Sequence, residues 1–145
     1  MSSSYIPFTD LKQKIHSYTN AQWQEEWNRK ENNKLFEIRP NLSEKLPSPG
    51  GSRKDNVVFT HLKIGNTFLT HSHLLKQGKA PQCALCRESL TVKHLLLTCK
   101  EYTEKRNKHY TAETIRELFR DVPPWLMLEF MKETELYKYI LSQEN

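Results

Sequence analysis

A short cysteine-rich stretch constrains this chain more than any other feature. The segment PQCALCRESLTVKHLLLTC, residues 81–99, holds all three cysteines of the 145-residue chain and one of its six histidines. Its spacing is C-x2-C-x7-H-x4-C, through Cys83, Cys86, His94 and Cys99. Three thiolates and one imidazole are ligands of the type and number that a structural zinc ion takes. The pattern therefore predicts a zinc site, against the alternative of three buried free cysteines and a surface histidine.

The same pattern predicts what the metal does. Four protein ligands close the tetrahedron, whereas a catalytic zinc keeps one position open for water. With its cysteines committed to the metal, the chain lacks a thiol for nucleophilic catalysis. The middle of the chain offers only Glu88, Glu101 and Glu104 as carboxylates, and no glycine-rich phosphate loop is present. We therefore expect a structural site and no enzymatic activity.

The last two ligands set a condition on the helix expected around them. His94 and Cys99 are five residues apart, and five residues on an ideal α-helix turn through about 140° beyond a full circle. Both side chains can reach one ion only if Cys99 lies at or past the end of the helix. The three leucines between them would pack the site against other helices.

Apolar periodicity predicts a mainly α fold. The expected helices cover residues 9–18, 19–35, 57–65, 67–78, 89–110, 111–121 and 125–141. The β-branched start of residues 57–65 also allows an extended segment, although Val58 and Leu62 at i, i+4 favour helix. We expect Thr19 with Gln22 to form a capping box, Thr67 to cap another helix, and Pro123–Pro124 to separate the last two.

The expected helices arrange into an arm and a module. Trp23 and Trp27 share one helix face and are expected to anchor core, with base stacking as the alternative. A Pro-, Gly- and Ser-rich segment, residues 41–56, is interpreted as a linker between an N-terminal helical arm, residues 1–40, and a zinc-binding module, residues 57–142. The fold class is thus a small helical domain stapled by one Cys-Cys-His-Cys zinc site.

Composition agrees with a small, metal-stabilised domain. Hydrophobic residues make up 37% of the chain, which supports only a modest core. No apolar run is long enough for a membrane helix, and the first residues do not resemble a secretory signal. We therefore expect an intracellular, reducing compartment, nuclear or cytoplasmic, where clustered cysteines more often bind metal than pair with one another.

Positive charge is concentrated in the middle of the chain. Residues 56–110 contain nine Lys and Arg against three Asp and Glu, whereas residues 111–145 contain four against seven. A concentrated positive field favours phosphate backbones, although an ordinary solvated face has the same composition. The candidate phosphate contacts are Lys63, Lys76, Lys79, Arg87, Lys93, Lys100, Lys105, Arg106 and Lys108.

Several segments occur in an order that resembles a known family. These are IPFTDLK, WQEEW, NKLFEIRP, HLKIGNTFLTH, PQCALC and TVKHLLLTC. Together they resemble the C-terminal tail of non-LTR retrotransposon polyproteins, which follows the reverse transcriptase and the RNase H domain. The resemblance covers roughly residues 5–106 and implies a Cys-Cys-His-Cys zinc module that helps handle template nucleic acid, without polymerase or RNase H activity of its own.

The chain departs from the family in one basic motif. Where the family has RLRIGH, this chain has HLKIGN: His61 replaces the first Arg, Lys63 keeps the second positive charge, and Asn66 replaces the His. Loss of an arginine removes a bidentate phosphate contact, so weaker nucleic-acid binding is expected.

Two classes of function follow from these observations. The first is a non-catalytic, zinc-stabilised module that binds RNA or DNA through its phosphates. The alternative is a protein-interaction or structural module, or a truncated element fragment without present function. In that case the apolar last helix could form a partner face, with Trp125, Leu128, Met131 and Leu136.

Overall fold

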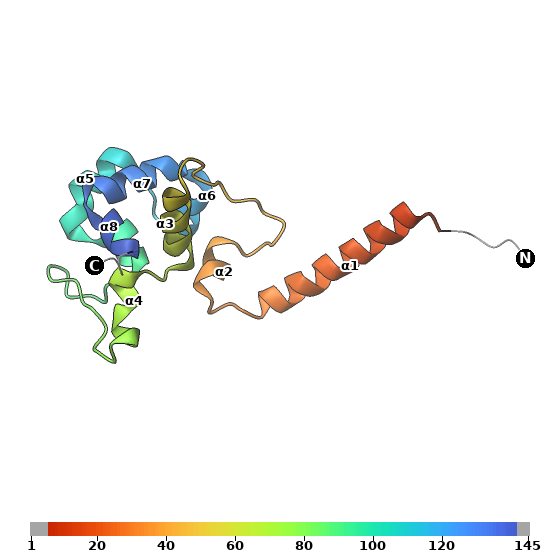
Figure 1. Ribbon diagram of the computed structural model, residues 1–145, viewed down its shortest axis with the longest axis horizontal. Coiled ribbons are helices and arrows are strands. Elements are labelled where there is room, and N and C mark those ends of the chain that lie inside the picture. Colours follow the sequence, from red (N-terminus) through yellow and green to blue (C-terminus); the bar gives the residue numbers. More distant parts are fainter. Residues whose placement is uncertain (1–5, 142–145) are drawn as a thin grey trace, which may run out of the picture. The chain divides into compact units, whose positions relative to one another are not determined.

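The computed structural model describes residues 6–141, and its contacts divide the chain into two compact units, residues 1–45 and 46–145 (Figure 1). Nearly all regular structure in the described residues is helical, and the one departure is an isolated antiparallel bridge between Gln82 and Ser89. The prediction of a mainly α fold is confirmed. The division between the units falls after Lys45, within the segment interpreted as a linker.

The N-terminal unit contains one long helix and one short helix. α1 spans Phe8–Asn28 and α2 spans Lys34–Ile38. The prediction of two separate helices over residues 9–35 is wrong, because α1 continues through Thr19. That hydroxyl donates to the carbonyl oxygen of Ile15 at 2.8 Å, a bond within a continuous helix rather than a cap.

The two tryptophans of α1 differ in environment. Trp27 is half-buried, packs its ring 5.7 Å from that of Phe36, and donates from Nε1 to the carbonyl oxygen of Arg39 at 2.7 Å. Trp23 is 62% exposed, so the expectation that both residues anchor core is wrong for Trp23. Residues 39–42 turn back onto α1, where Gln24 bonds the backbone of Pro40 and Leu42.

The C-terminal unit contains the remaining helices. They are α3 (Arg53–Ile64), α4 (Phe68–Leu75), the π-helix η1 (His94–Thr98), the 3-10 helix η2 (Lys100–Tyr102), α5 (Thr103–His109), α6 (Ile115–Asp121), α7 (Pro124–Glu133) and α8 (Leu136–Leu141). α7 packs against α5, α3 and α8, and α8 also packs against α3 and α4. α3 begins at Arg53, earlier than the helix expected from residue 57, because the Ser52 hydroxyl caps the Asp55 N–H.

The core of this unit is aromatic and aliphatic. Its largest fully buried side chains include Phe59 of α3, Phe119 of α6 and Phe130 of α7. The ring of Phe59 meets that of Phe119 edge-on at 5.4 Å, and Tyr110 meets Phe130 similarly at 5.6 Å. The Tyr110 hydroxyl donates to the Leu96 carbonyl at 2.9 Å, which ties the helix core to the cysteine-rich segment.

Local capping signals decide several helix ends. Thr67 caps α4, as predicted, and Pro124 occupies the first turn of α7. Thr67 also exchanges hydrogen bonds with Thr70 in a capping box that the sequence analysis did not predict. The helix expected over residues 125–141 is wrong in one respect, because it breaks between α7 and α8. Thr134 bonds back to the Phe130 carbonyl, and Glu135 adopts a left-handed conformation with φ of 60°.

The partner face considered for the last helix is mostly buried. Leu128, Met131 and Leu136 are buried in the unit's own core, whereas Trp125 is exposed. Three of the four residues therefore stabilise the fold rather than offer a surface.

No helix within residues 6–141 is both long and apolar enough to cross a bilayer.

Candidate metal centre

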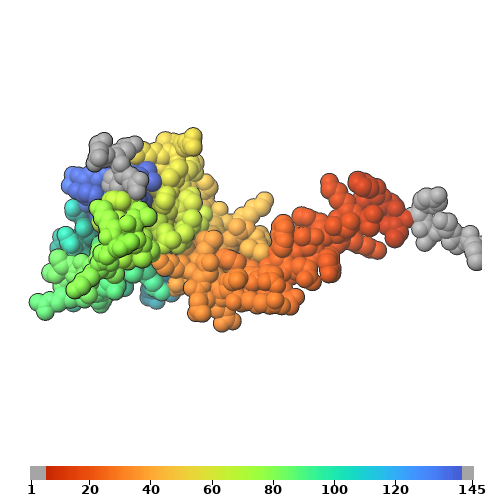
Figure 2. Space-filling model, turned by 60° about the horizontal axis from the view of Figure 1, so that its bottom comes forward, coloured from red at the N-terminus to blue at the C-terminus, as the bar shows by residue number. Residues whose placement is uncertain are grey.

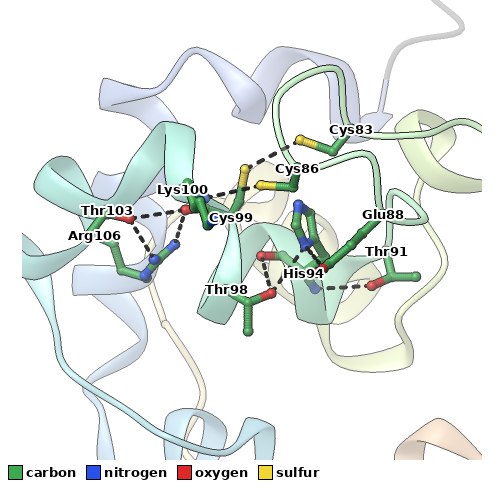
Figure 3. Close-up of polar contacts among 10 residues, drawn as sticks. All are labelled: Cys83, Cys86, Glu88, Thr91, His94, Thr98, Cys99, Lys100, Thr103 and Arg106. Atoms are coloured by element: carbon green, nitrogen blue, oxygen red, sulfur yellow. Dashed lines mark hydrogen bonds and ion pairs between the residues drawn. The ribbon is translucent and has the colours of Figure 1, made fainter.

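The four predicted ligands converge on one point. The ligand atoms of Cys83, Cys86, His94 and Cys99 all lie within 4.8 Å of one another (Figure 3). Cys83, His94 and Cys99 are buried and Cys86 is half-buried. These residues form a group that can hold a metal ion, as the spacing predicted.

A tight turn brings the first two cysteines together. The Cys83 N–H donates to the Glu88 carbonyl at 2.8 Å, and the Arg87 N–H donates to the Cys83 carbonyl at 2.9 Å. Arg87 has φ of 60°, in the left-handed region that a non-glycine residue adopts only when its surroundings hold it there. The bridge between Gln82 and Ser89 closes the base of this turn, so both sulfurs face inward.

A π-helical turn brings His94 and Cys99 to the same side of the backbone. Residues 94–98 form η1, and the Cys99 N–H donates to the His94 carbonyl at 2.8 Å, five residues back. This wider turn places Cys99 above His94, where a regular α-helix would separate them by about 140°. Cys99 then has an extended conformation, with ψ of 122°, and ends the turn. The expectation that Cys99 lies at the helix end is confirmed, and the π turn adds a device that the sequence did not reveal.

The histidine has the orientation of a metal ligand. Its Nδ1 lies 3.1 Å from Glu88 Oε2 and 3.1 Å from Thr98 Oγ1. Its Nε2 is buried and has no hydrogen-bond partner among the described residues. A proton on Nδ1 shared with Glu88 leaves the Nε2 lone pair for a metal, and such a carboxylate commonly orients a ligating histidine. A buried, unsatisfied nitrogen next to three thiols fits a metal.

The thiol pKa values of the two buried cysteines, Cys83 and Cys99, are shifted in opposite directions. The backbone N–H of Cys86 stabilises the Cys83 thiolate, so the pKa of Cys83 falls to about 6. Burial raises the pKa of Cys99 to about 11. Their sulfurs are 3.7 Å apart, so the first proton leaves easily and the second is retained until a cation compensates the charge. Metal binding supplies that compensation.

Backbone contacts connect the ligands to the helices that follow. The Lys100 N–H donates to Cys86 Sγ at 3.4 Å. Arg106, on α5, donates to the Cys99 carbonyl at 3.1 Å and to the Thr103 hydroxyl at 3.4 Å. Arg106 is only 8% exposed, so its guanidinium holds the cysteine-rich segment and cannot reach a phosphate. It is therefore removed from the candidate phosphate contacts.

The other candidate cations lie in three kinds of environment. Arg87, Lys93 and Lys100 are exposed and belong to the same segments as the ligands. Lys63 and Lys76 lie over the rings of Phe59 and Phe68, at 5.0 and 5.7 Å from the ring centroids. The remaining residues are all exposed: Lys79, and Lys105 and Lys108, which contact Glu133.

Two functional residues escaped the sequence-based prediction. The sequence analysis considered Glu88 only as a possible catalytic carboxylate, and it did not consider Thr98. A carboxylate two residues after the second cysteine was the available signal for Glu88, because the turn that places Cys86 also returns residue 88 toward the histidine.

Comparisons with protein-family models, with curated proteins and with solved structures gave no match for this chain.

Proposed function

We propose that the C-terminal unit is a zinc-stabilised, non-catalytic module that binds the phosphate backbone of RNA or DNA. The observation that carries this proposal is the placement of Arg87, Lys93 and Lys100. All three side chains are exposed, and each belongs to a turn or helix end that also supplies a metal ligand. A folded metal centre would therefore fix the positions of three cations at once.

The donor set favours zinc. Thiolate and imidazole ligands select zinc over magnesium or calcium, which take oxygen ligands. Four protein ligands leave no position for water, so the ion has a structural role. One Zn²⁺ with three thiolates and a neutral imidazole carries a net charge of −1, which the neighbouring cations outweigh.

The likeness of segment order to retrotransposon polyprotein tails supports the same proposal. In that interpretation the module accompanies enzymes that lie on other parts of a polyprotein and contributes binding of the template. The departures at His61 and Asn66 remove two potential contacts, so Arg87, Lys93 and Lys100 would carry a larger share of binding here.

The first experiment measures the metal. Protein purified without added metal should contain about one equivalent of zinc by elemental analysis. Protein that contains no metal, takes up none, and keeps its helicity in chelator would contradict the metal centre.

The second experiment measures nucleic-acid binding across salt concentrations. Filter binding to a single-stranded RNA and to a DNA duplex should weaken steeply with salt, since phosphate contacts release counterions. The triple variant Arg87→Ala, Lys93→Ala, Lys100→Ala should flatten the salt slope by about 2–3. The matched control, Lys30→Ala, Lys45→Ala, Lys138→Ala, loses the same charge from exposed sites elsewhere and should change the slope less. No binding at low salt would overturn the proposal.

A further inference from the structure

The exposed Trp23 borders a hollow within the N-terminal unit, the Trp23 hollow. One wall comes from α1, where Asn20, Trp23 and Gln24 share a face at i, i+3 and i+4. The other wall comes from residues 39–43, which turn back onto α1. The hollow has a volume of about 490 Å³, within the range of ligand-binding pockets. Its residues belong to the orange part of the surface in Figure 2.

Hydrogen bonds hold the second wall in place. Gln24 donates to the Pro40 carbonyl at 2.8 Å and accepts from the Leu42 N–H at 2.8 Å. Trp27 donates from Nε1 to the Arg39 carbonyl at 2.7 Å. The hollow is therefore formed before a ligand arrives, which lowers the cost of ordering on binding.

A guanidinium without a carboxylate partner lies in this hollow. Arg39 is half-buried and donates from Nη2 to the Leu42 carbonyl, and its buried Nε has no hydrogen-bond partner among the described residues. No carboxylate within residues 6–141 forms an ion pair with Arg39. A half-buried cation without a counter-ion is costly, and a bound anion offsets that cost. The Nη nitrogens keep further N–H groups, and their planar fork matches the oxygens of a phosphate.

Trp23 offers a stacking surface beside that cation, and two asparagines add polar groups. The Trp23 side chain is 62% exposed. Asn20 and Asn41 also line the hollow, and Asn41 Oδ1 accepts from the Ser43 N–H at 3.0 Å, which leaves its amide N–H groups as donors. A nucleotide has a flat aromatic face, donors and acceptors on the edge of its base, and a phosphate. It therefore matches the ring, the amides and the guanidinium together.

We propose that the Trp23 hollow binds one nucleotide of single-stranded RNA or DNA, with the base stacked on Trp23 and the phosphate at Arg39. Bases within a duplex are stacked on their neighbours, whereas unpaired bases are free to stack on a protein ring. A second hollow shares Trp23 and Leu42 with the first and continues to Trp27 and Asn33. It provides a place for the adjoining nucleotide, which favours a chain over a free mononucleotide. The inference rests on the proposed function only for the class of partner, since all of its residues lie in the N-terminal unit.

The first test measures the contribution of the base, with the full chain loaded with zinc. Fluorescence anisotropy compares a labelled single-stranded oligomer of about ten nucleotides with an abasic oligomer that keeps the same phosphates. Trp23→Ala should weaken binding of the intact oligomer at least about fivefold and that of the abasic oligomer less than about twofold. Trp125→Ala, which removes a tryptophan that is 58% exposed in the other unit, is the matched control and should change both by less than about twofold.

The second test measures the contribution of the phosphate. Arg39→Gln should flatten the slope of log affinity against log salt by about 0.7, the value for one phosphate of a single strand. Arg29→Gln, which removes an arginine already paired with Glu25 and Glu26, is the matched control and should leave the slope unchanged. Trp23→Phe should also leave the slope unchanged and should retain most of the affinity, because a phenyl ring still stacks on a base.

Two further measurements guard against local unfolding. Amide hydrogen exchange of residues 33–42 verifies that the second wall of the hollow persists in Arg39→Gln. Arg39→Lys keeps the positive charge and should retain the salt slope even where it loses affinity.

The outcomes separate this inference from the proposed function. Equal affinity of wild type for the intact and abasic oligomers, or equal losses from Trp23→Ala and Trp125→Ala, would overturn the inference. A nucleoside monophosphate that binds as tightly as the oligomer would overturn it too, by assigning the hollow to free nucleotides. A loss from Trp23→Ala that persists in the triple variant Arg87→Ala, Lys93→Ala, Lys100→Ala would support the inference even if that triple variant bound as well as wild type. The reverse result, a flattened slope in the triple variant and no effect of Trp23→Ala, would overturn the inference alone.

Discussion

The two units of the chain bury their apolar side chains to very different extents. In the N-terminal unit, α1 extends over 21 residues without one buried side chain, and Trp27 with α2 forms a small contact at one end. In the C-terminal unit, shorter helices bury Phe59, Phe119 and Phe130 around a common core, and the cysteine-rich segment joins that core through Leu95 and Leu96.

The difference shows that an amphipathic pattern does not by itself create a core. A helix as long as α1 can persist on local hydrogen bonds and ion pairs, such as those from Arg29 to Glu25 and Glu26. Helices of 6–12 residues are marginal alone and depend on tertiary packing. We therefore expect the C-terminal unit to respond cooperatively to damage and α1 to respond locally.

Chelation of the metal should produce the largest contrast. Removing the proposed zinc with EDTA, or introducing Cys83→Ser, should expose residues 82–102 to amide hydrogen exchange and lower the Tm of the C-terminal unit by more than about 10 °C, since structural zinc contributes roughly 10–16 kcal/mol in small peptides. Exchange within α1 should not change. Equal loss of protection in both units would contradict their independence.

Substitution of Arg106 should be the next most damaging change. Arg106→Met leaves the buried Cys99 carbonyl with only the longer hydrogen bond from the Thr103 hydroxyl, at 3.4 Å, which costs about 1–3 kcal/mol of unfolding free energy. Asn107→Ala, at the exposed neighbouring position, is the matched control. Chemical denaturation without nucleic acid separates this structural role from phosphate binding. An unchanged stability would contradict the structural role of Arg106.

Loss of Glu88 should weaken the metal site without abolishing it. Glu88→Ala removes the carboxylate beside His94 Nδ1, and we expect metal affinity to fall about tenfold. Residues that orient a ligating histidine typically cost about 10- to 100-fold in metal affinity when they are removed. We expect a loss at the lower end of that range because the Glu88 side chain is 67% exposed. Competition with a chromophoric chelator measures it, and Glu101→Gln serves as control. A fall equal to that of a lost ligand would mean that Glu88 itself binds the metal.

A polar contact between α3 and α8 gives a smaller, pH-dependent effect. The Tyr137 hydroxyl donates to Asp55 Oδ1 at 2.8 Å, and this bond, followed by that from Ser52, lowers the pKa of Asp55 below 3.8. A lowered folded-state pKa stabilises the fold above the unfolded value, and this contribution is lost as the pH falls through the folded value. Tyr137→Phe should therefore cost about 1 kcal/mol near neutral pH.

The pH dependence provides the check on that assignment. The stability difference between wild type and Tyr137→Phe, from urea denaturation, should shrink once the pH falls below about 4. In the Asp55→Asn background, Tyr137→Phe should show a difference that no longer depends on pH. A difference that grows on acidification would contradict a lowered pKa of Asp55 in the folded state.

The smallest global effect is expected in the N-terminal unit. Trp27→Leu removes the Nε1 bond to Arg39 and the ring contact with Phe36. Amide protection of residues 33–42 should fall, while the Tm of the C-terminal unit should change by less than about 2 °C. A large shift in that Tm would show that the two units unfold together.

Local chemistry made part of this structure predictable. The cap at Thr67 and the break at Pro123–Pro124 follow from hydrogen bonding and ring geometry within a few residues. The fusion of two expected helices into α1 was missed, because a threonine can satisfy its hydroxyl on the preceding turn as readily as at a cap. Glu135 was missed for the opposite reason, since nothing local favours a left-handed glutamate.

The sequence by itself determined the ligand set, because Cys83, Cys86, His94 and Cys99 are close in the chain and few metal-binding patterns share their spacing. Only the tertiary structure decided how His94 and Cys99 reach one point, through a π turn that is stable when its leucines pack in a core. It also decided that Arg106 is buried and Trp23 exposed. Burial depends on which segments meet in space, and neither charge nor hydrophobicity of one residue specifies that.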